Sequence, residues 1–531
     1  MAAWLTVVLS LLHFCNAAFD LAMGDDGDLE SFVTRPELKA PKFRVTMYEP
    51  DEVDRGYWFV GPYGDIYQKD HAAKYYQACQ TGPHIFDGDG NLVWSGACQF
   101  RNQNTCDFRA YEAPNGTSYL SAIVNFNVHT NDPVGRGVIM NSSYNFQQTI
   151  EAPPTVDIFN MHELKLIDDG KAALYITVLS ERADLTNLSS QHRAGWIQNP
   201  GFEELDLETG EVTFRWHAYP HVSLEESTLP LADDIKENTW NWFHPNSVDK
   251  NADGDYLISG RYVDAIYKVS GRDGSVLWRL GGKRSDFALQ GFNFSRQHDA
   301  QWIDFNDDYE TISFLDNGGD EVVRTSNYTS ALFVRLDKKN MSAHVTKRIV
   351  RPGERFSGAR GNLQRLPSGH VFGGWSENCH ISEHATDGRL LMEAEFASKR
   401  FVTYRAYKFN FTGQPQEPPA MKAFAYGLDE ESAVTVYYVS WNGATEVSSW
   451  NFYREGSGDA VLIGSAARTG FETRLQARGY VDGKVFVEAL DVHGLVLGRS
   501  LSTDITSYID QAVQKPRVGA SVAKGAEKTE L

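Results

Sequence analysis

The sequence predicts a nearly all-β protein in which repeated sheets precede a smaller β domain. Helical periodicity is scarce, whereas short alternating runs bounded by Gly, Asp and Asn recur along most of the chain. Two hairpin patterns also alternate within residues 56–412. One hairpin of each kind makes a four-stranded sheet, and repeats of such sheets are typical of β-propeller blades.

The first hairpin pattern combines an Asp-Gly type of turn with a strand that ends on Trp or another bulky residue. Gly and Asn tolerate the left-handed backbone angles of tight hairpins, which favours such turns. We expect these hairpins to form the outer half of each blade. The copies cover residues 86–94, 205–216, 269–278 and, more weakly, 383–396.

The second hairpin pattern starts with His162, His244 or His298, each before a hydrophobic strand and a turn. Two further copies, 107–116 and 361–369, lack the histidine. With an earlier copy whose outer hairpin is clear, the count predicts a six-bladed β-propeller. We expect strand 401–407 to close the ring by pairing with the first blade, which removes free sheet edges.

The predicted domains follow from these patterns. After a Pro-rich linker the hairpin pattern stops, and strands 434–441, 449–453 and 484–490 predict a small sandwich that resembles fibronectin type III or immunoglobulin-like modules. The expected order is a signal peptide (1–18), an N-terminal extension (19–55), the propeller (56–412), a linker (413–419), the β-sandwich (420–503) and a disordered tail (504–531).

The N-terminal residues have the layout of a cleaved signal peptide, with an apolar run and a small-residue end. No later segment is apolar over the roughly 20 residues that a membrane span needs. We therefore expect a protein of the secretory pathway, either secreted or in the endoplasmic reticulum, because the end at Leu531 resembles a retrieval signal. Glycosylation sequons fit that compartment and occur at Asn115, Asn141, Asn187, Asn293, Asn327, Asn340 and Asn410.

Charge and cysteine content argue against two classes of function, nucleic-acid binding and zinc binding through cysteines. A net charge of −20 argues against a nucleic-acid partner, since phosphate backbones are bound by clustered Lys and Arg. Cys79, Cys98, Cys106 and Cys379 are spaced too widely for a zinc knuckle and predict one or two disulfides of open pairing. We expect no metal site and no cofactor. The oligomeric state stays open.

The motifs around the second and third histidines resemble the arylsulfotransferase (ASST) family, in particular its eukaryotic branch found in fungi. The matching stretches are residues 242–249, 256–282 and 296–301. The resemblance implies a six-bladed propeller that moves a sulfuryl group between phenolic compounds through a covalent histidine intermediate. It covers the predicted propeller, and segment 440–445 is similar to the trailing module of fungal members.

Carried over by motif, the family's His-x-Asn pair corresponds to His244 and Asn246, and its arginine to Arg261. Blade order assigns the earlier histidine to His162 and the nucleophile to His298. The residue types suit the chemistry, because a neutral imidazole is a competent nucleophile and a guanidinium pairs with sulfuryl oxygens. We therefore expect His298, His244, Arg261 and His162 to be catalytic and Asn246 to bind a small phenolic substrate.

Two other functions remain open at this point. The same propeller would suit a secondary-metabolite enzyme that cyclises or isomerises an aromatic intermediate, with His and Arg acting only through hydrogen bonds. It would also suit a secreted glycoprotein that binds a ligand or a protein without catalysis. Covalent sulfation of a histidine separates the first function from both others.

Overall fold

The computed structural model describes residues 26–64, 79–124, 135–189, 193–231, 239–456 and 458–509. The predicted signal peptide lies outside these residues. The chain forms two compact units, which are Met1–Gln416 with Asn442–Thr445 and Glu417–Trp441 with Glu446–Leu531. None of the described helices combines the length and the apolar composition that crossing a membrane requires.

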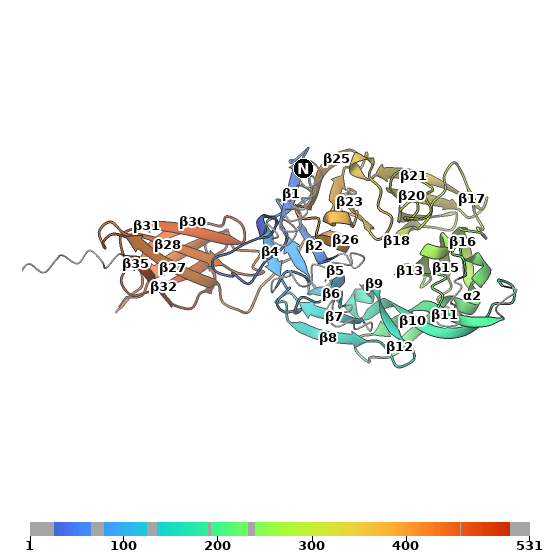
Figure 1. Ribbon diagram of the computed structural model, residues 1–531, viewed down its shortest axis with the longest axis horizontal. Helices are drawn as coiled ribbons and strands as arrows, with labels where there is room; N and C mark the ends of the chain where they lie inside the picture. Colours follow the sequence, from blue (N-terminus) through green and yellow to red (C-terminus); the bar gives the residue numbers. More distant parts are fainter. Residues whose placement is uncertain are drawn as a thin grey trace, which may run out of the picture. The chain divides into compact units, whose positions relative to one another are not determined.

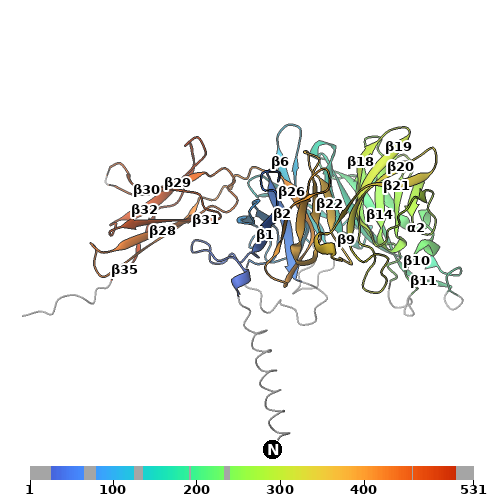
Figure 2. The same cartoon turned by 90° about the horizontal axis from the view of Figure 1, so that it is seen from above.

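The described residues of the first unit form six β-sheets around a common axis (Figure 1), the arrangement of a β-propeller. Figure 2 shows the strands of these sheets running roughly along that axis. From the axis outward, the first sheet is β26 (Phe401–Phe409), β2 (Tyr57–Gly64), β3 (His84–Phe86) and β4 (Leu92–Ser95). The second is β5 (Thr105–Glu112), β6 (Ser118–Val124), β7 (Arg136–Asn141) and β8 (Phe146–Glu151). The third is β9 (Ile158–Ile167), β10 (Ala172–Asp184), β11 (Ala194–Asp206) and β12 (Val212–His217).

The remaining sheets of this unit include two with a fifth strand. The fourth sheet is β13 (Pro245–Lys250), β14 (Tyr256–Gly260), β15 (Ala265–Val269) and β16 (Val276–Gly281). The fifth is β18 (His298–Phe305), β19 (Tyr309–Asp316), β20 (Ser330–Asp337), β21 (Ser342–Val350) and β17 (Ala288–Leu289). The sixth is β22 (Asn362–Arg365), β23 (Val371–Gly374), β24 (Ile381–His384), β25 (Leu390–Phe396) and β1 (Phe43–Met47). Since β1 pairs with β25, part of the predicted N-terminal extension completes the sixth sheet.

The described helices are all short. Within the described ranges the one α-helix is α2 (Ala218–His221). The 3-10 helices of the described residues are η1 (Asp26–Asp28), η3 (Asp168–Gly170), η4 (Leu224–Glu226), η5 (Arg261–Val263), η6 (Pro352–Glu354) and η7 (Glu377–Cys379).

The ring closes through β26, as the sequence predicts. This strand comes after the sixth sheet in sequence and yet pairs antiparallel with β2 of the first sheet, with Tyr57 opposite Phe409. The innermost strands contact one another in the order β26, β5, β9, β13, β18 and β22, and β22 returns to β26. A closed ring leaves no inner edge exposed for pairing with another chain.

The second unit contains two facing sheets. One is β31 (Glu472–Arg478), β28 (Val434–Ser440), β27 (Ala420–Gly427) and β35 (Thr506–Ile509). The other is β30 (Val461–Ala467), β29 (Ser449–Arg454), β32 (Lys484–Leu490) and β33 (Val496–Arg499), with β34 (Thr503–Asp504) also on β32. Tyr437 of one sheet packs against Phe452 of the other at 5.7 Å. The strands β34 and β35 correct the prediction of disorder from residue 504, because short backbone pairings extend order to Ile509.

One disulfide joins Cys79 to Cys98. Cys106 and Cys379 are free and buried, and burial raises the pKa of the Cys106 thiol to about 12. Both thiols are therefore protonated and unreactive at neutral pH.

The inner strands carry irregularities at corresponding places. The register of β5 shifts between Cys106 and Arg109, that of β13 between Pro245 and Ser247, and that of β18 between His298 and Gln301. A β-bulge of this kind redirects side chains away from strict alternation. Asp107 and Asp299, inside two of the bulges, adopt positive φ angles of 52° and 57°. The bulges thus allow polar side chains to point toward the axis.

Arg405 of β26 is the centre of a buried ionic cluster on the axis. Its Nη1 donates hydrogen bonds to Asp107 Oδ1 and Glu163 Oε2, each at 3.1 Å. Its Nη2 donates to the Asn246 carbonyl at 2.7 Å and lies 3.4 Å from Asp299 Oδ1. One guanidinium therefore joins the inner strand of the first sheet to those of the next four.

The carboxylates of this cluster also hold the backbones of neighbouring sheets. Asp107 Oδ2 accepts a hydrogen bond from the Leu164 N–H at 2.8 Å, and Asp299 Oδ2 accepts one from the Leu363 N–H at 2.9 Å. Each carboxylate thus bonds both to Arg405 and to the following blade. Hydrogen bonds to charged groups are the stronger kind, so these links fix the spacing of the blades.

We predict that Arg405→Met lowers the free energy of unfolding of the propeller by about 3–5 kcal/mol, because it leaves buried carboxylates without their partner. Urea unfolding followed by circular dichroism measures this change. Arg389→Met is the matched control, since Arg389 pairs with Glu52 and Asp387 at the exposed surface and its loss should leave the midpoint unchanged. Equal midpoints for both variants would contradict the role of Arg405.

Candidate functional site

Three histidines from successive inner strands lie close together near the axis. His162 lies in β9, His244 directly precedes β13, and His298 begins β18. The rings of His162 and His244 meet edge to face, with centroids 4.9 Å apart and planes at 85°. His298 is near enough to both for its charge state to act on theirs.

The hydrogen bonds of His298 determine its tautomer. Its Nδ1 lies 2.7 Å from Asn317 Oδ1 and 3.0 Å from the Arg296 carbonyl oxygen, and both partners are acceptors. The Asn317 amide is oriented by its own Nδ2, which donates to the Ser357 carbonyl at 2.8 Å. Nδ1 therefore carries the hydrogen, and the lone pair is on Nε2, where it accepts from the Arg360 backbone N–H at 3.2 Å.

The other two histidines differ from each other in the same respect. His162 Nδ1 contacts Asn160 Oδ1, so its Nε2 also has the lone pair. His244 Nδ1 instead accepts a hydrogen bond from Asn241 Nδ2 at 2.7 Å, so its Nε2 carries the hydrogen. The site consequently combines two basic Nε2 atoms with one Nε2–H donor.

Arg261 provides the positive charge of the site. It starts η5 directly after β14 and is 7% exposed. Its Nη2 donates to the Gly358 carbonyl at 2.9 Å, but its buried Nε has no hydrogen-bond partner among the described residues. An unsatisfied buried donor on a cation is costly unless a ligand completes it, so Arg261 favours an anion as the ligand.

Arg296 is also buried near the site, but its charge is neutralised. Its Nε donates to Asp320 Oδ2 at 2.7 Å and its Nη1 to Asp264 Oδ1 at 3.0 Å. The half-buried ring of Tyr262 lies 4.8 Å from the Arg261 guanidinium carbon and 5.4 Å from that of Arg296. Arg261 is thus the cation of this pair that is left to bind an anion.

Burial keeps all three histidines neutral at physiological pH. It is the main cause that lowers each pKa from the ordinary value of 6.5. The pKa of His244 falls to about 3, with Arg261 and Arg296 adding to the effect. Those of His162 and His298 also lie well below 6.5, and after burial the strongest effect on His298 comes from the positive charge of Arg261. Neutral imidazoles retain the lone pairs that nucleophilic and base chemistry need.

The structure brings His162, His244, His298 and Arg261 together but gives Asn246 a different place. Asn246 is fully buried; its Nδ2 donates to the Gln297 carbonyl at 2.7 Å and its Oδ1 accepts from the Asp299 N–H at 3.3 Å. In this structure its polar atoms bind the next inner strand, so contact with a substrate stays a prediction and the observed bonds give Asn246 a structural role.

Several site residues escaped the sequence analysis. Asn241 and Arg296 precede predicted histidines by three and two residues, so the local motifs contain them. Asn317 follows β19, and Tyr404 lies in β26 with its ring 5.2 Å from that of His162. No local signal marks these last two, since only closure of the ring brings them to the histidines.

The predicted glycosylation sites lie mostly at the surface. Asn141 is half-buried, and its Oδ1 accepts hydrogen bonds from the backbones of Ser143 and Asn145. The six exposed asparagines are Asn115, Asn187, Asn293, Asn327, Asn340 and Asn410.

One group of metal-ligand type occurs among the described residues, on the sixth sheet and the segment before β2. Atoms of Asp54, His370 and Glu383 lie within 4.8 Å of one another. However, Lys408 Nζ lies 2.5 Å from Glu383 Oε2, so an ammonium group already neutralises the buried carboxylate. We assign these residues to an ion-pair cluster.

The lowered histidine pKa values predict a loss of stability in acid. Unfolded histidines protonate near pH 6.5 and the folded ones do not, so the unfolded state takes up more protons as the pH falls below that value. Below pH 6.5, each such histidine should lower the free energy of unfolding by about 1.4 kcal/mol for every unit that the pH falls. Unfolding midpoints at a series of pH values should show a slope about 1.4 kcal/mol per unit smaller in His298→Asn. An unchanged slope would show that His298 already protonates in the folded state.

The position of Asn246 predicts a structural effect of its substitution. Asn246→Ala should lower the free energy of unfolding by about 1–3 kcal/mol, because backbone groups lose their partners. Asn362→Ala is the matched comparison, since the Asn362 amide bonds to both backbone groups of Ala406 in the same way. A stable Asn246→Ala protein with weakened ligand binding would restore the substrate-binding prediction.

Comparisons with solved structures find distant likenesses. A Bacteroides caccae protein of unknown function has 11% identity and a TM-score of 0.38, over 67% of this chain and 99% of that chain. Virginiamycin B lyase from Staphylococcus aureus, a catalytically inactive form with quinupristin, has 12% identity and a TM-score of 0.27, over 73% and 93%. The GH43 protein BlXynB from Bacillus licheniformis has 8% identity and a TM-score of 0.30, over 75% and 89%. Likenesses this weak carry no functional argument.

The family comparison is more informative than the structural one. No curated protein matches the chain. The model of the arylsulfotransferase (ASST) family matches residues 124–397, which is more than half of the chain and contains all three histidines and Arg261. The chain belongs to the arylsulfotransferase family.

Proposed function

We propose that this protein transfers a sulfuryl group from an aryl sulfate to a second phenol, with His298 as the covalent acceptor. The observation that carries the proposal is the polarity of the His298 ring: Nδ1–H is held by Asn317 and the Arg296 carbonyl, which leaves the Nε2 lone pair on a neutral imidazole. A nucleophilic histidine needs this tautomer held in place.

In the first step, Nε2 of His298 attacks the sulfur of the aryl sulfate. The N–S bond forms, the S–O bond to the aryl group breaks, and its electron pair leaves on the phenolate oxygen. The Nε2 lone pair accepts a long hydrogen bond of 3.2 Å from the Arg360 N–H before the reaction, and the new bond to sulfur takes its place. The ring becomes positive, and the two acceptors on Nδ1–H stabilise that charge.

Arg261 and His244 bind the sulfuryl oxygens in this proposal. Arg261 has a buried Nε with no partner among the described residues, and the His244 tautomer supplies an Nε2–H donor. Donors fixed in a buried site stabilise charge that develops in the transition state more than solvated donors do.

In the second step, the oxygen of the accepting phenol attacks sulfur and the N–S bond of His298 breaks. The phenol loses its proton to His162, whose Nε2 has the lone pair and whose lowered pKa keeps it neutral beforehand. His162 thus acts as a general base. The products are the new aryl sulfate, neutral His298 and a proton.

A location in the secretory pathway belongs to the same proposal. The Cys79–Cys98 disulfide and the exposed sequons support it, because disulfides persist in oxidising compartments. Assignment to the fungal branch of the family also stays a prediction from the motifs.

The decisive test is incubation with a chromogenic aryl sulfate, followed by intact-mass and peptide-mass measurement under alkaline conditions. We expect phenol release and the gain of one sulfuryl group on the peptide that contains His298, and neither in His298→Asn. Arg261→Lys should lower kcat by about 10²–10³-fold, since it removes fixed donors from the transition state.

His344→Asn is the control for this test. His344 lies on β21, the fourth strand from the axis in the same sheet as His298, and its loss should leave transfer unchanged. Phenol turnover without a mass gain would replace the covalent route by direct transfer. Absence of both at neutral and alkaline pH would reject sulfuryl transfer and leave cyclisation, isomerisation or simple binding.

A further inference from the structure

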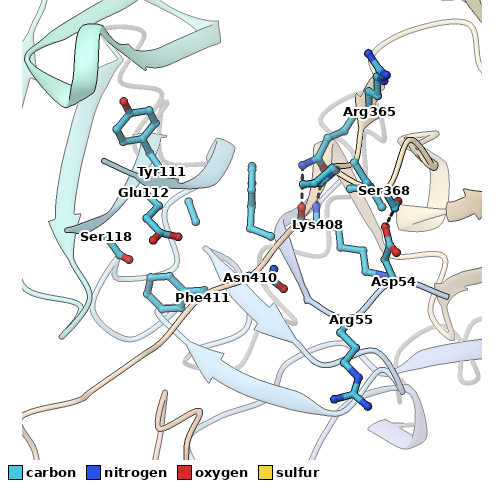
Figure 3. Close-up of a pocket in the computed structure, with 15 residues that line it drawn as sticks. Asp54, Arg55, Tyr111, Glu112, Ser118, Arg365, Ser368, Lys408, Asn410 and Phe411 are labelled. Atoms are coloured by element: carbon cyan, nitrogen blue, oxygen red, sulfur yellow. Dashed lines mark hydrogen bonds between the residues drawn. The ribbon is translucent and has the colours of Figure 1, made fainter. Parts of the chain in front are cut away.

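A hollow lies at the end of the inner strands away from the histidines. It is a cavity of about 530 Å³ between the ends of β5, β22 and β26 (Figure 3). Lys408 at its wall follows Arg405 by three residues, about 10 Å along a strand. The fully buried Arg405 cluster lies between this cavity and the histidines, so the cavity is separate from the proposed sulfuryl site.

Asn410 stands within this cavity. It follows β26, is exposed, and starts the sequon that ends in Thr412. In the view of Figure 3 the Asn410 side chain lies between two walls of the cavity. One wall contains Tyr111, Glu112 and Ser118, and the other contains Asp54 and Ser368.

The middle residue of the sequon anchors its backbone. Phe411 is 8% exposed, and its ring lies 5.8 Å from that of Phe59 and 6.0 Å from that of Tyr144. Asn410 and Phe411 both line the cavity, but Phe411 is packed against these rings whereas Asn410 is exposed, so the buried ring anchors the backbone that carries the Asn410 side chain. A group attached to Asn410 would therefore start in a fixed direction.

We propose that this cavity holds the first sugar residues of a glycan attached to Asn410. The lining contains apolar side chains (Tyr111, Leu366 and Pro367) that suit the ring face of an N-acetylhexosamine, and hydroxyl and carboxylate groups (Ser118, Ser368, Glu112 and Asp54) that suit its hydroxyl and acetamido groups. Covalent attachment gives the sugar a high effective concentration, so weak contacts are enough to hold it.

The attachment needs a glycosyl diphosphate lipid as the donor. The Asn410 amide nitrogen bonds to the anomeric carbon, the bond from that carbon to the diphosphate oxygen breaks, and the amide proton leaves with the diphosphate. The inference rests on passage through the secretory pathway and does not depend on the proposed sulfuryl transfer.

Asn293 offers a matched control within the same chain. Its sequon has the same pattern, with an exposed asparagine, a buried phenylalanine (Phe294, 6% exposed) and a hydroxyl residue (Ser295). Asn293 does not line this cavity. A glycan there should extend freely from the surface.

The test uses the full chain secreted from a eukaryotic host and treated with a peptide N-glycosidase, first folded and then unfolded. Glycopeptide mass spectrometry follows release at Asn410 and Asn293. On the folded protein we expect release at Asn410 to be about tenfold slower, because the sugar must leave the cavity first. After unfolding, the two rates should be equal.

Equal release from the folded protein would overturn the proposal, as would an unmodified Asn410, whether or not Asn293 is modified. A second variant keeps the test independent of enzyme access. Thr412→Ala removes the sequon at an exposed residue and should lower the Tm of the secreted protein by about 2 °C. The same substitution in protein made without glycosylation should leave Tm unchanged, and an equal drop in both preparations would reject a glycan seated in the cavity.

Discussion

The guanidinium of Arg405 is the constraint on which the ring depends. It is fully buried, and it bonds to Asp107, Glu163 and the Asn246 carbonyl from three different inner strands. Charges in such an interior are tolerated only when they are paired and hydrogen-bonded. The carboxylates must therefore converge on the axis, and each inner strand that carries one is held at the distance this pairing allows.

The β-bulges of the inner strands make this convergence possible. Regular alternation would send consecutive side chains to opposite faces of a sheet. In β18 the shift between His298 and Gln301, together with the positive φ of Asp299, lets the imidazole and the neighbouring carboxylate both lie near the axis. A larger irregularity in β9 leaves residues 160–163, which include His162 and Glu163, out of the regular pairing with β10. The ionic cluster and the histidine site are therefore neighbours along the axis, since bulges such as that of β18 position residues of both.

The charge distribution of the site depends on which of its arginines have carboxylate partners. Arg296 is paired with Asp264 and Asp320, whereas the Nε of Arg261 has no partner among the described residues. Burial keeps the histidines neutral, and the charge of Arg296 is balanced by two carboxylates. The positive charge without a carboxylate partner in this pair is therefore that of Arg261. A neutral nucleophile beside a fixed cation suits an anionic substrate such as a sulfate ester, because attack does not require a protonated imidazole.

The sequence by itself determined the repeats, the closing strand and the recurring histidines, because hairpin turns and alternating hydrophobicity are local patterns, and the resemblance to the family added Arg261. Membership of the propeller class followed from the same local signals. Only the tertiary structure showed where the amide of Asn246 bonds, since its motif is the same whether that amide faces a ligand or the next strand. It also brought in Asn317 and Tyr404, which lie far from the histidine motifs in sequence. Their partners come from other strands, and contacts between distant strands exist only once the ring has closed.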